Sequence, residues 1–346
     1  MNTKRFSLYA LVALFLAALF YLQFRTWRGF DWSVFLQRTA NIKHHLLNIF
    51  FAVAFIYFAY LLRAVRWRIF LLPVKRTSTR ELIAPTIIGF TGLALLGRPG
   101  EFIRPYLISR KVNLGFSSQL AVWTVERIFD LGSFAVLFTL ALLNSETRAL
   151  LHGFHIGGIA VAGMVGGLTA LTAIILKGET LANWVARLFS HRAEHLGNLI
   201  AVRIREFRAG LNTIHGFPAF VQLVIVSVVM WTVIGFSYWQ VMLSYGEPVL
   251  NRPRQVPIVM ASSMLGSMIQ LPGVGGGSQL ATIFTLQNIL HVPRELAASC
   301  GILLWMVTFM AIIPVGLALA QHERLSLRKL SKESHAEEVK EELAEG

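Results

Sequence analysis

Three ionisable residues interrupt an apolar stretch of the chain, "WTVERIFDLGS", at residues 123–133. Glu126 and Asp130 are one helical turn apart, and Arg127 can reach Asp130 across three residues. If this stretch is a membrane helix with a rise of about 1.5 Å per residue, these groups lie about 15 Å deep, near the bilayer midplane. A charge at that depth is costly unless it faces a cavity or an opposite charge. The stretch therefore predicts a site for a headgroup or a proton, or else a structural charge cluster that ties spans together.

A second group of charges lies in "GRPGEFIRPYLISRK", residues 97–111. Arg98, Glu101 and Arg104 follow one another in steps of three, which places them on one face of a helix. Arg104 can pair with Glu101 or hold a phosphate through its planar fork of donors. We expect either a functional role for Glu101 and Arg104 or a structural ion pair, and Arg98 can extend to the membrane interface.

The most flexible backbone in the chain lies in "LPGVGGGSQL", residues 271–280, between two apolar runs. Non-helical backbone at membrane depth is tolerated where protein buries it or where it lines a watery cavity. Glycines permit unusual backbone angles, and a helix that resumes near Ser278 would present free N–H groups to an anion such as a phosphate headgroup. The alternative is a tight turn between close-packed arms. The candidate site residues here are Gly275, Gly276, Gly277 and Gln279.

The elements that must position these residues are membrane helices. The chain has 346 residues, of which 55% are hydrophobic and 14% charged, and this composition predicts an all-α polytopic membrane protein. About six apolar runs are long enough to cross as full transmembrane helices. These runs are residues 6–24, 46–62, 118–143, 156–176, 219–243 and 296–320.

Two further apolar runs, residues 82–96 and 256–271, are too short for a comfortable crossing, and both end at Pro-Gly. We interpret them as re-entrant broken helical hairpins; counted as spans, they would raise the total to eight or nine segments. Each begins near a proline, Pro85 in one and Pro257 in the other. Two broken helices that enter from opposite faces are typical of an inverted repeat, whose substrate site forms near the midplane. The sequence thus favours an inverted repeat.

The formal charge of +14 does not indicate nucleic-acid binding, because the basic residues lie between apolar runs instead of on one soluble face. The positive-inside rule accounts for them if both termini are cytoplasmic and the two short runs are re-entrant. Residues 177–216 then form a basic amphipathic connector at the cytoplasmic surface. We expect a single membrane domain over residues 1–330 and a charged, disordered tail over 331–346.

No pattern in the chain indicates a catalytic centre, a metal site or a cofactor. Cys300 is the single cysteine and is expected to pack inside a helix. The "HRAEH" stretch at residues 191–195 lacks the glutamate arrangement of a zinc protease, and no nucleophile motif is present. The sequence therefore favours a protein that is not an enzyme.

Three stretches together, "ALLGRPGEFIRPYLISRK", "VERIFDLGS" and "LPGVGGGSQL", resemble the lysylphosphatidylglycerol synthase transmembrane-region family over about residues 33–321. This is the flippase-like domain also found in the membrane part of the multiple peptide resistance factor. The resemblance implies a bacterial inner-membrane protein that moves a lipid between leaflets, without the aminoacyltransferase domain. It also implies an acidic residue where this chain has Gln279, so a lysylated lipid is not the expected substrate. The polar residues carried over by motif position are Glu101, Arg104, Glu126, Arg127 and Asp130.

The leading hypothesis is a flippase-like transporter for a phospholipid or another lipid-linked headgroup. Its expected partners are membrane lipids, either an anionic phospholipid or a lipid carrier, with a lipid-modifying enzyme and a second copy of the chain as further candidates. The alternatives are a membrane-embedded component of a glycosyl or aminoacyl transferase system, and a scaffold for such an enzyme that transports nothing. A transferase predicts a chemically altered lipid, whereas a scaffold predicts that Glu101→Gln and Arg127→Ala leave the phenotype intact.

Overall fold

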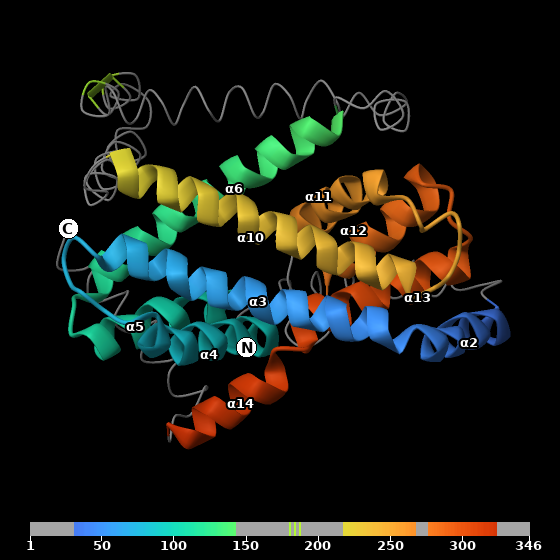
Figure 1. The fold of residues 1–346 in the computed structure, drawn as a ribbon, viewed down its shortest axis with the longest axis horizontal. Coiled ribbons are helices and arrows are strands. Elements are labelled where there is room, and N and C mark those ends of the chain that lie inside the picture. Colours follow the sequence, from blue (N-terminus) through green and yellow to red (C-terminus); the bar gives the residue numbers. More distant parts are fainter. Residues whose placement is uncertain are drawn as a thin grey trace, which may run out of the picture.

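The computed structural model describes residues 31–142, 217–267 and 276–323, together with Thr180, Asn183, Trp184 and Arg187. Within these residues the secondary structure is helical (Figure 1). The principal helices are α2 (Trp32–Asn41), α3 (Leu46–Leu71), α4 (Thr79–Leu96), α5 (Ile103–Val112), α6 (Phe116–Leu142), α10 (Phe217–Leu243), α11 (Val256–Gly266), α12 (Gly277–Phe284), α13 (Arg294–Trp305) and α14 (Ile313–His322). Short helical turns join them: η1 (Ile42–His45), η2 (Arg98–Phe102), η3 (Pro253–Gln255), η4 (Thr285–Ile289) and η5 (Met306–Met310). The chain is an all-α polytopic membrane protein, as the composition predicted.

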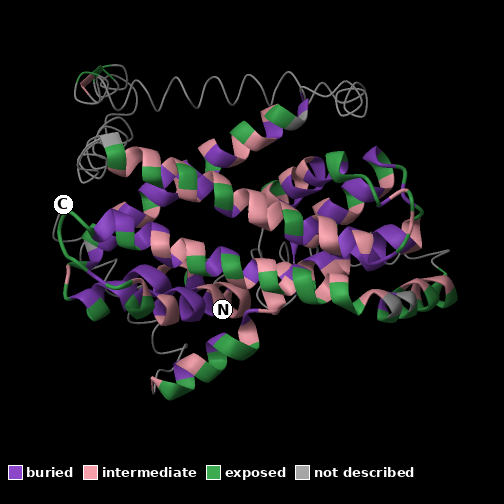
Figure 2. Ribbon diagram, viewed as in Figure 1, coloured by how far each residue is buried: buried purple, intermediate pink, exposed green. Residues whose placement is uncertain are grey.

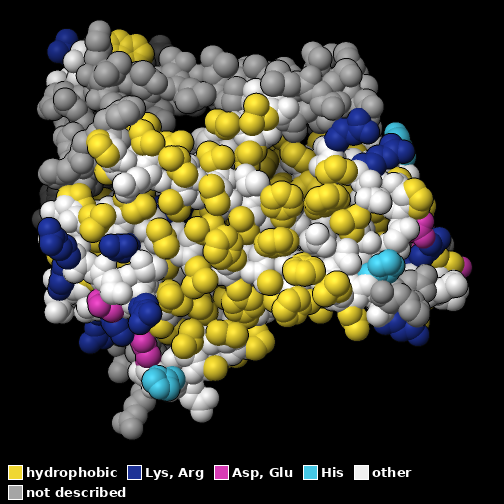
Figure 3. All heavy atoms as spheres, viewed as in Figure 1, with side chains coloured by type: hydrophobic (Ala, Val, Ile, Leu, Met, Phe, Trp, Pro, Cys, Tyr) yellow, Lys and Arg dark blue, Asp and Glu magenta, His cyan; other side chains and the backbone are white. Residues whose placement is uncertain are grey.

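Helices α3 and α10 form the centre of the molecule and lie against each other along their length (Figure 1). The sequence of α3 contains neither glycine nor proline until Pro73 stops the helix. Large apolar side chains on both helices point outward, among them Phe50 at 66% exposure and Ile225 at 55%. Figure 3 shows these side chains as a broad hydrophobic band, with basic residues gathered at its two ends. This distribution suits a helix pair that crosses a bilayer.

Four stretches among the described residues are long and apolar enough to span a membrane: Leu46–Leu71, Thr79–Leu96, Pro218–Leu243 and Arg294–His322. Two of them differ from the predicted runs. The span expected at residues 46–62 continues to Leu71, and the run expected at 82–96 begins at Thr79 and is long enough to qualify as a span. Both helices were predicted too short because arginines inside or beside them were taken as the end of the apolar run.

Helices α4 and α5 form an antiparallel hairpin, which we call the first hairpin. A side chain at Gly89 would collide with the backbone of Arg104, and one at Gly100 with the backbone of Gly92, so the arms touch at small residues. The open ends of the hairpin also meet, because Nζ of Lys75 donates to the carbonyl of Val112 at 2.6 Å. The chain therefore enters and leaves the first hairpin at one end of the molecule. Re-entry into the membrane stays a prediction, because α4 is itself long and apolar enough to span.

Helices α11 and α12 form the second hairpin, and its arms approach in the same way. A side chain at Gly266 would collide with the carbonyl of Gly277. The Ser263 and Ser278 hydroxyls lie 2.8 Å apart, and the hydroxyl of Tyr238 donates to Ser263 at 2.8 Å. These contacts make α11 and α12 a second pair of closely packed arms.

The two hairpins open at opposite ends of α3. The first follows the C-terminal end of α3, at Lys75. The second follows the loop after α10, where Glu247 pairs with Arg38 of α2, next to the N-terminal end of α3. Figure 1 shows α4 and α5 toward the left end of α3 and the α11–α13 region toward the right. This is the arrangement that an inverted repeat predicts.

The last span is broken in its middle. Helix α13 passes through a π-helical turn, η5, before α14 begins near Pro314. Such a turn leaves backbone groups without their usual helical partners, and the hydroxyl of Tyr57 donates to the freed carbonyl of Ala311 at 2.6 Å. In Figure 2, α14 carries much exposed surface while α5 and α13 are largely buried. Cys300 is fully buried in α13, as its packing role predicted.

Several predictions fall on residues outside the described ranges. They are the spans at 6–24 and 156–176, most of the connector at 177–216, the "HRAEH" stretch and the tail at 331–346.

Candidate functional site

Three helices bring charged side chains together in the interior of the described part of the molecule. Helix α3 supplies two arginines, α5 supplies one, and α6 supplies the three residues predicted from its sequence. We call this group the ion cluster. Its members are Arg63, Arg66, Arg104, Glu126, Arg127 and Asp130.

Glu126 is fully buried and binds guanidinium groups from two other helices. Its Oε1 accepts a hydrogen bond from Nη1 of Arg104 at 3.0 Å, and its Oε2 accepts a second one from the same side chain. Arg66 of α3 also donates to its Oε1. A carboxylate bound by a planar fork is held strongly and in one orientation, so Glu126 fixes α5 against α6 and α3.

Asp130 lies one turn further along α6 and is also buried. Its carboxylate accepts hydrogen bonds from Nη1 of Arg66 at 2.7 Å and from the indole of Trp231 on α10 at 3.2 Å. Arg127 reaches it at 3.1 Å, as the three-residue spacing predicted. Arg66 forms ion pairs with both Glu126 and Asp130. This confirms the prediction that the two acids share one face of the helix.

Aromatic rings cover the arginines. The guanidinium of Arg104 lies 4.5 Å from the Trp67 ring centre and 4.9 Å from that of Phe90. Arg63 lies 4.8 Å from the same Phe90 ring. These contacts shield the charges from lipid and add cation–π attraction, which is strongest where the groups are desolvated.

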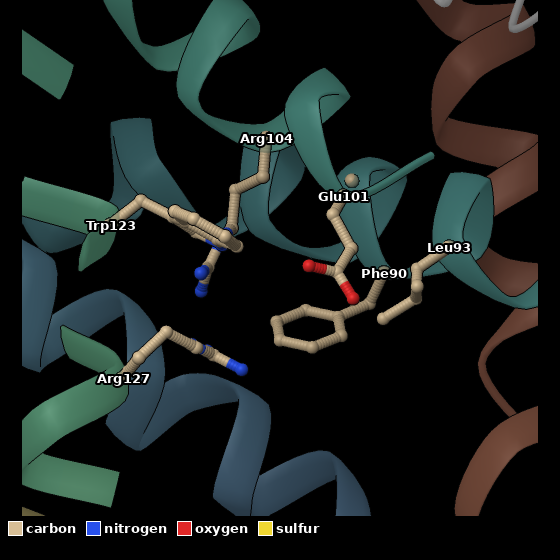
Figure 4. A pocket seen from close by; sticks show the side chains of 7 residues that line it. Phe90, Leu93, Glu101, Arg104, Trp123 and Arg127 are labelled. Carbon is tan, nitrogen blue, oxygen red and sulfur yellow. The ribbon is translucent and has the colours of Figure 1, made fainter. Parts of the chain in front are cut away.

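A small pocket opens beside the ion cluster, between the first hairpin and α6 (Figure 4). Arg104 and Arg127 extend into it with the carboxylate of Glu101 across from them. Arg127 is the more accessible arginine, with 39% of its side chain exposed, whereas Arg104 is almost fully buried at 4%. The lining residues are Gly89, Phe90, Leu93, Glu101, Arg104, Trp123 and Arg127.

One of the two alternatives considered for Arg104, a pair with Glu101, is not found. Arg104 is paired with Glu126 of α6, not with Glu101 three residues before it. Glu101 pairs instead with Arg98, at 3.3 Å. The reason is geometric: Glu101 belongs to η2, and the change from this tight turn to α5 alters which faces the two side chains occupy.

The residues predicted from the glycine stretch lie in a different part of the molecule. Gly276 and Gly277 form the start of α12, whose main contacts are with α11, α13 and η4. Gln279 is half-buried on the same helix. Gly276 has the unusual backbone angles that were expected, with φ 62° and ψ −145°, while Gly275 lies outside the described residues. The pocket beside the ion cluster is lined by the first hairpin and α6, so the expectation that glycine-loop amides and Arg104 hold one phosphate together gains no support.

Two members of the ion cluster were missed at the sequence level. Arg63 and Arg66 follow the span predicted at residues 46–62, because the first arginine was expected to end the apolar run. The apolar residues Ile69, Phe70 and Leu71 that follow were the available signal that the helix continues beyond them. In the part of the chain that the structure describes, no group of three metal-ligating side chains is present.

The chain matches the family model described as "Lysylphosphatidylglycerol synthase TM region" over residues 8–316. The match begins earlier than the resemblance suggested and includes both hairpins and the ion cluster. Searches of curated proteins and of solved structures found no match. Because the family model covers most of the chain, the protein belongs to the lysylphosphatidylglycerol synthase transmembrane-region family.

Proposed function

We propose that this multi-pass membrane protein is a flippase-like transporter that moves a phospholipid or another lipid-linked headgroup between leaflets. The observation that supports the proposal best is the ion cluster. Four arginines and two carboxylates meet between α3, which is long and apolar enough to span a membrane, and the helices α5 and α6 packed beside it, and two of the arginines face a pocket. Ionisable groups within the membrane are costly and usually mark the path of a polar substrate.

In this proposal the headgroup enters the pocket between the first hairpin and α6, while the acyl chains stay in the bilayer. Its phosphate binds Arg127, the more exposed arginine, and Arg104, which Glu126 holds in place. Glu126 and Asp130 keep the arginines in position when no headgroup is bound. The arms of the first hairpin touch at Gly89, Gly92 and Gly100, and the proposal requires them to separate there to give the headgroup room to pass.

Leaflet exchange of fluorescent lipids in proteoliposomes tests the proposal. The full chain is reconstituted with labelled phosphatidylglycerol, phosphatidylethanolamine or an isoprenoid phosphate, and the label in the outer leaflet is quenched by dithionite. We expect faster exchange than in empty vesicles for at least one lipid. Arg127→Gln should slow it about tenfold, because a hydrogen bond to a charged group contributes about 1.5 kcal/mol or more.

The matched control is Arg110→Gln, which removes the same charge from an exposed position on α5 outside the ion cluster. It should leave exchange unchanged. If every lipid exchanges at the rate of empty vesicles, the transport proposal is wrong.

We also propose that the protein resides in the bacterial inner membrane with both termini in the cytoplasm. The distribution of basic residues supports this orientation, since the positive-inside rule then applies to the loop before the first hairpin. A cysteine introduced at the exposed Arg76 should react with a membrane-impermeant maleimide only after the cells are opened. A cysteine at the exposed Asn251 should react from outside, and the buried Cys300 should not interfere. The reverse pattern would overturn the orientation.

A further inference from the structure

The ion cluster carries an excess of positive charge. Among the described residues it holds four guanidinium groups against two carboxylates, a formal excess of two. The nearby Arg98 and Glu101 pair adds no net charge. A buried charge without a counter-charge is unfavourable by several kcal/mol, and a charge on a partly exposed side chain such as Arg127 by less, so the cluster gains from an anion that compensates its excess.

The four arginines do not share the carboxylates equally. Arg66 has no exposed surface and hydrogen-bonds both carboxylates, so it is a structural member of the cluster. Arg104 binds both oxygens of Glu126. These contacts occupy most of the acceptor capacity of the two acids.

Three arginines of the cluster keep a buried donor atom without a hydrogen-bond partner among the described residues: Nη1 of Arg63, Nε of Arg66 and Nε of Arg127. Arg66 has no exposed surface and both of its Nη atoms are bound, so Arg63 and Arg127 are the less committed pair. Arg63 lies 3.8 Å from Glu126 and 3.7 Å from Asp130, too far for good hydrogen bonds, and its Nη1 has no hydrogen-bond partner among the described residues. Nε of Arg127 is likewise without a partner there, although its Nη2 reaches Asp130. Arg127 lines the pocket, whereas Arg63 is not among the lining residues and adds its charge beside Glu126 and Asp130.

A cationic headgroup finds no comparable partner in this pocket. The carboxylate of Glu101 is paired with Arg98. The aromatic rings that could hold an ammonium group face arginines instead: Arg104 and Arg63 lie over Phe90, and Arg127 lies 5.9 Å from the ring centre of Trp123. The pocket is therefore built for an anion.

We propose that the pocket beside Arg127 prefers a phosphate group with two negative charges, as in a lipid phosphate monoester or diphosphate, over a singly charged phosphodiester. The proposal deepens the proposed function, on which it relies for the lipid nature of the ligand. Its physical basis is charge matching: two ligand charges cancel the excess of two, whereas one leaves a net charge in a medium of low dielectric constant.

Binding of labelled lipids to the purified full chain, held in nanodiscs of phosphatidylcholine, tests this preference. The probes are phosphatidic acid, a monoester, and phosphatidylglycerol, a diester of similar size. At pH 8 we expect phosphatidic acid to bind at least about tenfold more tightly, the ratio that corresponds to a difference of about 1.4 kcal/mol. Equal affinities would overturn the proposal.

The pH dependence gives a second readout that needs no substitution. A phosphate monoester loses its second proton at about pH 6. Binding of phosphatidic acid should therefore tighten as the pH rises from 5 to 8, while binding of phosphatidylglycerol should change by less than about twofold. The ionisable groups that face the ligand from the surrounding helices are Arg63, Arg66, Glu101, Arg104, Glu126, Arg127 and Asp130. If these protein groups titrated instead, the binding affinities of both lipids would change by the same factor. Such a shared change, with no change in the preference for phosphatidic acid, would contradict the proposal.

Two substitutions separate this preference from general attraction of anions. Arg127→Gln and Arg63→Gln should each reduce the preference for phosphatidic acid, because each removes one of the two excess charges. Arg68→Gln removes a charge from an exposed position on the same helix as Arg63 and should leave the preference intact. A preference that survives both cluster substitutions would overturn the proposal.

Competition distinguishes a lipid from a free anion as the source of the phosphate. Displacement of labelled phosphatidic acid by millimolar inorganic phosphate would support the dianion chemistry and point to a soluble ligand. Displacement by unlabelled phosphatidic acid but not by inorganic phosphate would support the dianion chemistry and point to a lipid. The preference and the transport activity fail separately: leaflet exchange without a monoester preference refutes only this inference, and a preference without leaflet exchange refutes only the transport proposal.

Discussion

The first and second hairpins have the same backbone design but place different chemistry inside the membrane. In each, a glycine with nearly the same backbone angles precedes the returning arm: Gly97 has φ 71° and ψ −147°, and Gly276 has φ 62° and ψ −145°. Residues with side chains rarely adopt this conformation. The first hairpin then presents Arg104 to the ion cluster, whereas the second joins its arms through the Ser263 and Ser278 hydroxyls.

This difference shows that two hairpins with the same backbone arrangement need not carry the same polar side chains. Glycine contacts hold both pairs of arms together, and they require no charge. The charged chemistry depends on what the neighbouring long helices supply. Helices α3 and α6 bring five of the six members of the ion cluster to the first hairpin, while the neighbours of the second hairpin include Tyr238 of α10, which supplies a hydroxyl.

The largest effect should come from removing Glu126, the acid that holds the first hairpin to the long helices. Glu126→Gln leaves Arg104 without its counter-charge and Arg66 with Asp130 alone, and breaking a buried ion pair costs about 3–5 kcal/mol. Thermal unfolding of the detergent-solubilised protein, followed by tryptophan fluorescence, measures the loss. Arg127→Gln is the contrast, because it lowers the excess of positive charge and should change stability by less than about 1 kcal/mol. Similar losses in both variants would refute the charge balance described for the cluster.

A matched pair of glycine substitutions should have a smaller effect on stability and should separate the two hairpins by function. Gly89→Ala and Gly266→Ala each place a methyl group against the backbone of the opposite arm, and each should cost about 1–3 kcal/mol. Gly89→Ala displaces Arg104 and should therefore also slow leaflet exchange of labelled lipid, as measured by dithionite quenching. Gly266→Ala should destabilise the protein without that loss at temperatures where it stays folded. Equal slowing by both substitutions would mean that the second hairpin contributes to the substrate path as well.

The smallest effect should come from the hydroxyl pair of the second hairpin. Ser263→Ala and Ser278→Ala, combined in a double-mutant cycle, should show a coupling of about 0.6 kcal/mol, which is typical of hydrogen bonds between membrane helices. The same unfolding assay measures it. A coupling as large as that between Arg104 and Glu126 would show that the polar contacts of the two hairpins contribute equally to stability.

Much of this architecture was accessible from the sequence. The apolar runs predicted the helices around α10 and α13, and the paired Pro-Gly breaks predicted two hairpins that enter from opposite ends. The spacing of Glu126, Arg127 and Asp130 predicted a shared face, and the structure confirms it. Local spacing was sufficient in these cases because a helix fixes which nearby residues share a face.

The predictions that were wrong concern arginines. A pair with Glu101 was one of the two alternatives for Arg104, but Arg104 binds Glu126, 22 residues away. Arg63 and Arg66 were counted as part of a loop because a charge usually ends a membrane span. Their partners lie on α6, much further along the chain: Glu126 is 60 residues from Arg66. No rule of local spacing connects residues so far apart.

The sequence by itself determined that the protein is an all-α membrane protein, where most of its helices lie and where its backbone is broken, because these features follow from hydrophobicity and from the backbone restrictions of proline and glycine. Tertiary structure alone decided that four arginines share two carboxylates beside one pocket. The physical reason is that opposite charges in a membrane lower each other's cost only at contact distance. Which side chains reach that distance depends on how α3, α5 and α6 pack.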